Sequence, residues 1–432
     1  MRFWILPLLL LLGSSFVHRG ATEWDNLVDD FVRDYRSLHI QRLRIAYLDN
    51  LQGIQDAADV AQQAKVLREW EARLDGVDRQ NLTADQQWSY DLLTYQLKLD
   101  LERIALEIPW AANPPEHLSE GGLAQVPNGK AWYEHYLKRW VDASVTPDEL
   151  FAFGLKEVER VLSAMRALEA SDPAFRQKLT GADRYFYTQS AVDSACKDYR
   201  AWITPILTDY FPKMEEIPSL DIVPGRHERL AQTPGYYSEN TFYYNFFDKP
   251  YEKRQVPWLF MHEGVPGHHY EINFSRQLDL HPLQELFYQP GYSEGWAAYI
   301  EDIAFEFGAY RTPYEEYGKW EWDLIRSVRV PLDVGLNYYG WSDEKAMAFW
   351  RTNIQGIDDI GRRELARMKR WPCQVITYKY GARSIMRWKE HFEGEPGFDL
   401  KAFHEEVLKR GPLPYSVLGP LVLSSDRFRE KN

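Results

Sequence analysis

The sequence predicts a mostly α-helical protein with few short strands, in which many helices surround a cleft. Long stretches carry apolar residues three or four positions apart, which is the period of a helix buried on one face. The alternating pattern of a half-buried strand is scarce, and only residues 219–224 and 241–247 are modest strand candidates. No internal repeat and no Pro-, Gly- or Ser-rich linker divides the chain, so we expect one continuous fold.

Residues 1–20 have the order of a secretory signal peptide. Arg2 is followed by an apolar run over residues 3–12, and small residues stand at 13–15. The run is too short to span a bilayer comfortably, and this segment holds no cysteine that would accept a lipid. We therefore expect an exported protein, periplasmic or secreted, without stable membrane insertion after cleavage. An uncleaved N-terminal anchor is the alternative.

Helical signals dominate residues 21–230, which we expect to form an N-terminal helical region. Residues 24–38 and 86–108 show the helical period, and residues 50–75 are rich in residues that favour helices. Thr146 precedes Pro147 and Glu149 in the pattern of a capping box, so a helix is expected to begin there and to run towards Leu168.

Composition excludes several classes of protein. The 432 residues include 16 Trp, 27 Tyr and 21 Phe, which is far more aromatic content than a disordered chain carries. The formal charge of −13 argues against a nucleic-acid partner, because a phosphate backbone needs clustered Lys and Arg. Cys196 and Cys373 are too few for a disulfide framework or a Cys-rich zinc site, and they either pair once or stay free.

The residues that carry chemistry lie in residues 231–432, which we expect to form a second helical region continuous with the first. Residues 258–269 read WLFMHEGVPGHH, so a His–Glu pair ends an apolar segment and two more histidines follow. A histidine pair of this kind holds a zinc ion, and a carboxylate beside it activates water. His262 is therefore expected to be a ligand and Glu263 the general base.

Spacing alone leaves His268 and His269 as alternatives for the second ligand. On an unbroken helix, His269 would nearly eclipse His262 two turns along. Pro266 has no N–H to donate and Gly267 permits unusual backbone angles, so the helix is expected to loosen between the histidines. A bulge of two residues would then bring His268 to the ligand position.

Acidic residues that follow the histidines supply the remaining parts of a metal site. A helix expected over residues 291–307 offers Glu294 as the third ligand. Glu301 or Asp302, about two turns further along, would accept the second N–H of a liganding histidine. Glu271 is an alternate ligand.

These motifs resemble those of a known family. HEGVPGHH at 262–269 and SEGWAAY at 293–299 look like the paired motifs of the family named domain of unknown function 885. Its members are largely helical and resemble zinc-dependent metallopeptidases of the gluzincin type. Further matching stretches lie at 127–133, 146–160, 326–336, 340–342 and 372–374, with Tyr378 and Gly381, so the resemblance covers most of the chain in order.

The resemblance implies a set of metal ligands. The family's usual histidine pair is the first histidine of the motif and the histidine directly after Pro-Gly, which favours His268. The glutamate of the Glu-Gly-Trp-Ala motif corresponds to Glu294. We therefore expect one zinc ion per chain, held by His262, His268 and Glu294 with a fourth position left for water. His269 and Glu271 remain the alternates.

Donors to the oxyanion that forms during amide hydrolysis are expected near the metal. Tyr378 and Tyr380 are candidates, and the family match favours Tyr378. At the end of the segment 326–336 the family usually has a histidine, where this chain has Asn337, whose amide can still donate a hydrogen bond. This departure from the family pattern predicts altered or weaker activity.

Three further residues are expected to contact the substrate. Arg326 and Arg329 lie three apart on a predicted helix and would clamp a substrate carboxylate. The alternative for either arginine is an ion pair with Asp323 or Asp333. Tyr244 would line the cleft, and packing in the core is its alternative role.

The function expected from these features is that of an exported zinc-dependent metallopeptidase. The resemblance implies a deep cleft, which favours short peptides or chain ends as substrates over folded proteins. One alternative is an exported binding protein with weakened catalysis, which the departure at Asn337 suggests. Another is a metal-dependent amidase or esterase that acts on a non-peptide substrate. The sequence indicates neither a side-chain preference nor an oligomeric state.

Overall fold

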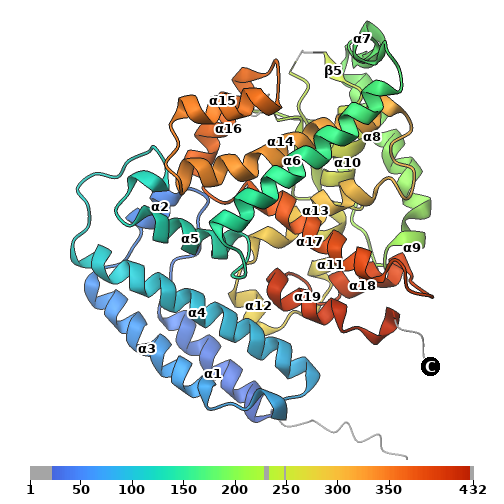
Figure 1. Ribbon diagram of the computed structural model, residues 1–432. Helices are drawn as coiled ribbons and strands as arrows, with labels where there is room; N and C mark the ends of the chain where they lie inside the picture. The colour runs from blue at the N-terminus through green and yellow to red at the C-terminus, as the bar shows by residue number, and fades with distance from the viewer. Residues whose placement is uncertain (1–21, 228–232, 248–249, 429–432) are drawn as a thin grey trace, which may run out of the picture.

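The computed structural model describes residues 22–227, 233–247 and 250–428. The predicted signal peptide and the border between the two predicted regions, at 230/231, lie outside these ranges. Helices make up most of the described chain and the strands are few and short (Figure 1). The prediction of a mostly α-helical fold is therefore confirmed. Within the described ranges, no helix combines the length and the apolar character needed to cross a membrane.

The first half of the described chain is a series of helices. They are α1 (Glu23–Ser37), α2 (Tyr47–Gln52), α3 (Ala57–Asp75), α4 (Ala84–Ala112), α5 (Gly129–Trp140), α6 (Pro147–Ala170), α7 (Phe175–Leu179), α8 (Gln189–Ile203) and α9 (Leu207–Tyr210). Helices α1, α3 and α4, coloured blue, lie side by side at one edge of the molecule (Figure 1). Helix α6 begins as predicted, because Thr146 and Glu149 form a reciprocal capping box.

The helix predicted over residues 50–75 is interrupted. Helix α2 ends at Gln52, and α3 starts only at Ala57. The Asp56 side chain accepts the backbone N–H groups of Ala58 and Asp59 at 2.9 and 3.0 Å, and this cap begins a new helix. The local composition favours helix on both sides of the break, so composition alone does not locate it.

In the described part of the chain, five short strands form two small sheets near its middle. They are β1 (Tyr185–Phe186), β2 (Asp221–Pro224), β3 (Gly235–Ser238), β4 (Thr241–Tyr244) and β5 (Tyr251–Glu252). Strand β4 pairs in parallel with β2 and antiparallel with β3, while β1 pairs antiparallel with β5. The two segments predicted as strands correspond to β2 and β4.

The second half of the chain carries the helices that build the site. They are α10 (Gln255–Glu263), α11 (His268–Arg276), α12 (Pro282–Leu286), α13 (Pro290–Ile303), α14 (Pro313–Asn337), α15 (Asp343–Asn353), α16 (Asp358–Arg370), α17 (Ile376–Phe392), α18 (Leu400–Leu408) and α19 (Tyr415–Leu423). The helix predicted to reach Phe307 ends at Ile303, four residues earlier.

Helices α13 and α17 pack with their backbones in close contact. A Cβ atom placed on Gly295 would lie 2.7 Å from the Cα of Gly381 and 1.9 Å from the hydroxyl oxygen of Tyr415. Only glycine fits at this crossing, because any side chain would have to separate the two helices. The contact holds the first turns of α13 beside the first turns of α17.

Buried charges join α6, α13, α14 and α17. Lys319 pairs with Asp302 and, at 3.0 Å, with Asp323, while Lys379 pairs with Asp323 and, at 3.1 Å, with Glu157. Burial alone would raise the pKa of Asp323, but the neighbouring cations hold it well below its ordinary value. A charge removed from this network would leave its partner buried and unpaired, which is strongly destabilising.

Both hydrophobic cores combine elements from the two predicted regions. One core packs side chains of α1, α3 and α4 together with those of α10, α13 and α17. The other packs side chains of α5 and α6 against those of α14, α15 and α16. Cys196 lies in the first core and Cys373 in the second, both as free buried thiols.

Candidate metal centre

His262 and His268 come from different helices. Helix α10 ends at Glu263, and α11 begins at His268, so the predicted loosening is a complete break over residues 264–267. A Cβ on Gly267 would lie 2.0 Å from the carbonyl oxygen of His262, so only glycine lets the chain turn this tightly. The indole N–H of Trp296 donates to the Pro266 carbonyl at 3.0 Å and holds the turn against α13.

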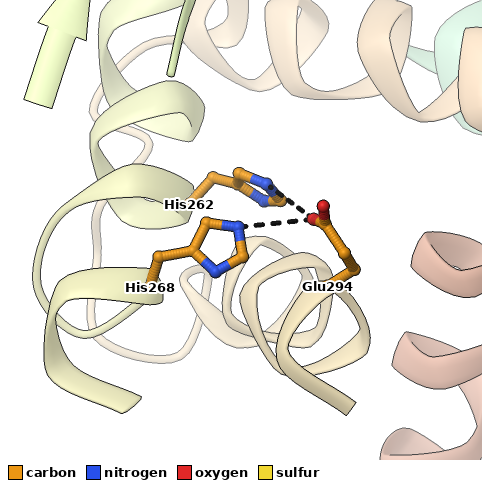
Figure 2. A group of neighbouring side chains, drawn as sticks. All are labelled: His262, His268 and Glu294. Atoms are coloured by element: carbon orange, nitrogen blue, oxygen red, sulfur yellow. Dashed lines mark ion pairs between the residues drawn. The ribbon is translucent and has the colours of Figure 1, made fainter. Parts of the chain in front are cut away.

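This turn brings His262 and His268 together opposite Glu294 (Figure 2). The two imidazole rings lie 4.7 Å apart, centroid to centroid, and nearly perpendicular. Glu294 Oε2 lies 3.7 Å from Nε2 of His262 and 3.3 Å from Nε2 of His268. One ligand atom from each of the three residues falls within 4.8 Å of the other two.

The geometry fits a single tetrahedral metal ion. Two ligand atoms, each about 2.0–2.2 Å from a tetrahedral zinc, stand about 3.3–3.6 Å apart. The distances of 3.3 and 3.7 Å to Glu294 Oε2 lie in or within about 0.1 Å of this range. That oxygen is buried and is faced by Nε2 of both histidines, so its lone pairs are available to a cation bound between the three residues.

Hydrogen bonds from behind the rings direct Nε2 of both histidines towards Glu294. His262 Nδ1 lies 2.7 Å from Glu301 Oε1, which therefore accepts its N–H. His268 Nδ1 lies 3.1 Å from the Ser293 hydroxyl, which donates its own proton to Glu271 at 2.7 Å. With Nδ1 protonated in this way, Nε2 of each ring carries the lone pair that a metal needs.

The alternate ligands lie elsewhere. His269 Nε2 is 2.9 Å from the Pro218 carbonyl and its Nδ1 is 3.2 Å from the hydroxyl of Tyr237, so neither nitrogen points to the site. Glu271 accepts hydrogen bonds from Ser293 and Ser275 and supports His268 from behind. The structure therefore places neither residue among the metal ligands.

The pKa values of Glu294 and His262 depend on burial and on their neighbours in the cluster. Burial would raise the pKa of Glu294, but its hydrogen bonds with His262 and His268 hold it well below the ordinary range. Burial and Arg326 would lower the pKa of His262, but the hydrogen bonds with Glu294 and Glu301 raise it to about 9. The metal-free cluster thus holds a proton where a cation would bind.

A pocket of about 480 Å³ opens at this cluster. Its lining includes the predicted residues His262, Glu263, His268, Glu294, Arg326, Arg329 and Tyr378. The Glu263 carboxylate makes no hydrogen bond with the described residues. Burial raises its pKa, although the two histidines act in the opposite direction. Glu263 is therefore a carboxylate beside the cluster that is free to exchange a proton.

Tyr378 contacts both the cluster and the wall of the pocket. Its ring stacks on that of His262 at a centroid distance of 6.1 Å. Its hydroxyl oxygen accepts hydrogen bonds from Gln374 Nε2 at 3.2 Å and from Arg367 at 3.4 Å. The hydroxyl proton of Tyr378 is given to none of the described groups, so it remains available to a ligand in the pocket.

The two predicted substrate arginines are paired within the protein. Nη1 of Arg326 donates to both carboxylate oxygens of Glu301, which also accepts the N–H of His262. Arg329 binds Glu364 through two hydrogen bonds of 2.8 Å. Both arginines are almost fully buried, so the prediction that they clamp a substrate carboxylate is not supported. They form ion pairs instead, although not with Asp323 or Asp333.

Two other predicted residues lie away from the pocket. Asn337 is buried at the end of α14, where it donates to the Met368 carbonyl and accepts the backbone N–H of Leu123. Tyr244 is fully buried, and its hydroxyl donates to the Gln189 carbonyl at 3.3 Å. Asn337 therefore fixes the backbone and Tyr244 packs in the core, and neither contacts the cluster.

Helix α16 contributes a wall of the pocket that was not predicted from the sequence. Ile360, Arg363, Glu364 and Arg367 line the pocket from this helix, and Trp371 follows them. The signal available in the sequence was the unusual charge of residues 358–370, which include four arginines in thirteen positions. That pattern is also typical of a solvated surface helix, so it does not by itself indicate a binding wall.

Comparisons with known proteins agree with this fold. A candidate lipoprotein from Colwellia psychrerythraea is similar in structure, with a TM-score of 0.63 and 24% identity, over 87% of this chain and 68% of that one. A candidate lipoprotein of unknown function from Shewanella oneidensis has a TM-score of 0.70 and 16% identity, over 94% of this chain and all of that one. No curated protein matches the chain.

A family model provides the assignment. It is described as a bacterial protein of unknown function, DUF885, and it matches residues 110–422, which include every residue of the cluster and of the pocket. The match spans most of the described chain from the end of α4 to α19. This protein therefore belongs to the DUF885 family of bacterial proteins of unknown function.

Proposed function

We propose that this protein is an exported zinc-dependent metallopeptidase that hydrolyses short peptides or chain ends. The observation that carries the proposal is the arrangement of His262, His268 and Glu294 around one point, with Glu263 beside them in the same pocket. Two imidazoles and one carboxylate with an open fourth position form the ligand set of a catalytic zinc rather than of a structural one.

Each residue has a definite task in this proposal. When bound, zinc supplies a Lewis acid that lowers the pKa of water and polarises a carbonyl group. Glu263 takes the proton of the attacking water and returns it to the leaving amine. Its raised pKa suits this exchange, because a proton shuttle works best when its pKa lies near the working pH.

Tyr378 stabilises the negative charge that develops on the substrate carbonyl oxygen. Its hydroxyl proton has no acceptor among the described residues, while Gln374 and Arg367 orient the oxygen from behind. A donor held in place before the reaction stabilises the developing charge without reorganisation. Asn337 has no part in this step, since its amide is engaged by the backbone far along α14.

Export belongs to the proposal as well. The order of residues in the segment 1–20 is that of a signal peptide, and the two structural relatives are candidate lipoproteins. The proposed ligands include no thiolate, so the centre would tolerate an oxidising compartment.

Substrate profiling tests the proposed function. We expect the purified, zinc-loaded protein to cleave members of a library of short peptides and to lose this activity when a chelator removes the metal. Hydrolysis of non-peptide amides or esters alone would favour the amidase or esterase alternative. Binding of peptides without any turnover would favour the weakened binding protein, although Asn337, which suggested it, lies outside the pocket.

Zinc affinity is expected to depend on pH. The hydrogen bonds with Glu294 and Glu301 raise the pKa of His262 to about 9 in the metal-free protein, against burial and Arg326. Zinc has to displace this proton, so below about pH 9 the apparent affinity should fall about tenfold for each pH unit. Calorimetry in buffers of different ionisation enthalpy should detect about one proton released at pH 7. Zinc uptake without proton release would contradict this.

Replacing Ser293 by Ala should weaken zinc binding about 10- to 100-fold, because His268 would lose the group that holds its Nδ1 proton. A competition titration with a zinc chelator measures the change. Ser275→Ala is the matched control, since Ser275 also donates to Glu271 but contacts no histidine. Equal effects of the two substitutions would show that Glu271, and not the orientation of His268, determines the affinity.

A further inference from the structure

The four arginines of the pocket differ in their partners. Arg326 and Arg329 are paired with Glu301 and Glu364. Arg363 and Arg367, both on α16, have no carboxylate within ion-pair distance among the described residues. Of the other acids of the lining, Glu294 belongs to the cluster with His262 and His268, and Glu263 lies beside it. Arg363 and Arg367 therefore have no ion pair of their own in the described chain, although Glu364 is near enough to interact electrostatically with both.

Arg367 is held beside the metal cluster with part of its guanidinium unused. One terminal nitrogen donates to Gln374 at 2.7 Å and to the hydroxyl of Tyr378 at 3.4 Å. Its Nε is buried and makes no hydrogen bond with the described residues. A buried donor without an acceptor is costly, so it indicates a position that a ligand completes. Tyr378, which stacks on His262, separates this arginine from the cluster.

We propose that Arg367, assisted by Arg363, binds a carboxylate of the substrate, and that this carboxylate is the C-terminus of a short peptide. The inference rests on the proposed function and adds a substrate class to it. Guanidinium groups bind carboxylates through two parallel hydrogen bonds, a match that a neutral amide cannot provide. The same anionic group could also come from an Asp or Glu side chain.

The surroundings of the arginines favour a chain end. Ile360, Trp322 and Trp371 line the same pocket and offer apolar surface. A C-terminal residue presents a carboxylate and, on the same Cα, a side chain that such a surface accepts. With its carboxylate at Arg367, the peptide would direct its preceding amide towards His262 and Glu263, and the enzyme would remove residues from the C-terminus.

A binding experiment tests the inference separately from hydrolysis. The protein is the full chain carrying Glu263→Gln, loaded with zinc, and the probes are Ala-Ala-Phe, its C-terminal amide and Ala-Ala-Glu amide. The tryptophans of the pocket provide a fluorescence signal, and calorimetry provides a second readout. We expect the free acid to bind at least about tenfold more tightly than either amide.

Substitutions on α16 test whether Arg367 causes the preference for the free acid. Arg367→Gln should remove the preference for the free acid, and Arg367→Lys should restore part of it, because lysine keeps the charge without the planar fork. Arg362→Gln is the matched control, since it removes one charge from the same helix at an exposed position outside the pocket. It should leave the preference unchanged.

Several results would overturn the inference. Equal binding of acid and amide, no binding of any probe, or a preference that survives Arg367→Gln would each contradict it. Tight binding of Ala-Ala-Glu amide would contradict the assignment to the chain end. If the acid preference holds but the wild-type protein cleaves no peptide, the proposed function fails while this site stands. If the wild-type protein cleaves peptides but shows no preference for the free acid, this inference fails while the proposed function stands.

Discussion

Replacing Glu263 by Gln should lower peptide turnover about 10²- to 10⁴-fold while one zinc ion stays bound. Glutamine keeps the shape and polarity of the side chain but cannot accept the proton of the attacking water. Glu263 is not among the three residues whose ligand atoms converge, so the metal should not depend on it. Steady-state kinetics on a cleaved peptide, with elemental analysis of the same sample, measures both quantities.

A surface substitution provides the control for this experiment. Glu285→Gln makes the same chemical change on α12, outside the pocket, and should leave turnover and metal content unchanged. If Glu263→Gln retained turnover comparable with that of the control, the proposed role of Glu263 would be wrong. Loss of zinc from Glu263→Gln would instead show that its carboxylate takes part in metal binding.

The two adjacent histidines should respond in opposite ways to replacement by alanine. His268→Ala should lose the zinc ion, because its Nε2 is one of the three converging ligand atoms. His269→Ala should keep one zinc per chain, because both ring nitrogens of His269 face Pro218, Tyr237 and Asn273. Elemental analysis of the folded fraction of each variant measures its zinc content.

Stability must be followed in the same samples. His269 is fully buried, so its removal leaves a cavity and unpaired groups and should lower the melting temperature of the metal-free protein. His268 is partly exposed, so in the absence of metal its replacement should lower the melting temperature less than that of His269 does. Retention of zinc by His268→Ala, together with its loss from His269→Ala, would refute the ligand assignment.

Local signals predict much of the fold. The capping box at Thr146 and the long helical period that became α4 depend on residues within a few positions of each other, and both were found where expected. The break between α2 and α3 was missed, although the cap at Asp56 is a local signal, because the composition on both sides of the break favours helix. Propensity describes the segment but does not by itself locate its ends.

The candidate site was predictable only in its centre. The spacing of His262 and Glu263, with the family resemblance, located the cluster, and the Pro266–Gly267 pair explained why two helices are needed. The partners of Arg326 and Arg329 could not be inferred, because Glu301 and Glu364 come from other helices. The same reason explains why Arg367 was overlooked, since its place in the pocket depends on how α16 packs against α14.

The glycine crossing between α13 and α17 has a mechanical consequence. Glu294 adjoins Gly295, and Tyr378 lies three residues before Gly381, so a main-chain contact fixes the distance between these two functional side chains. Contacts between backbones cannot relax by a change of rotamer, so this side of the pocket is its rigid wall. Under the proposed function, a movement that admits a peptide would therefore fall to other elements of the lining, among them β3 and α16.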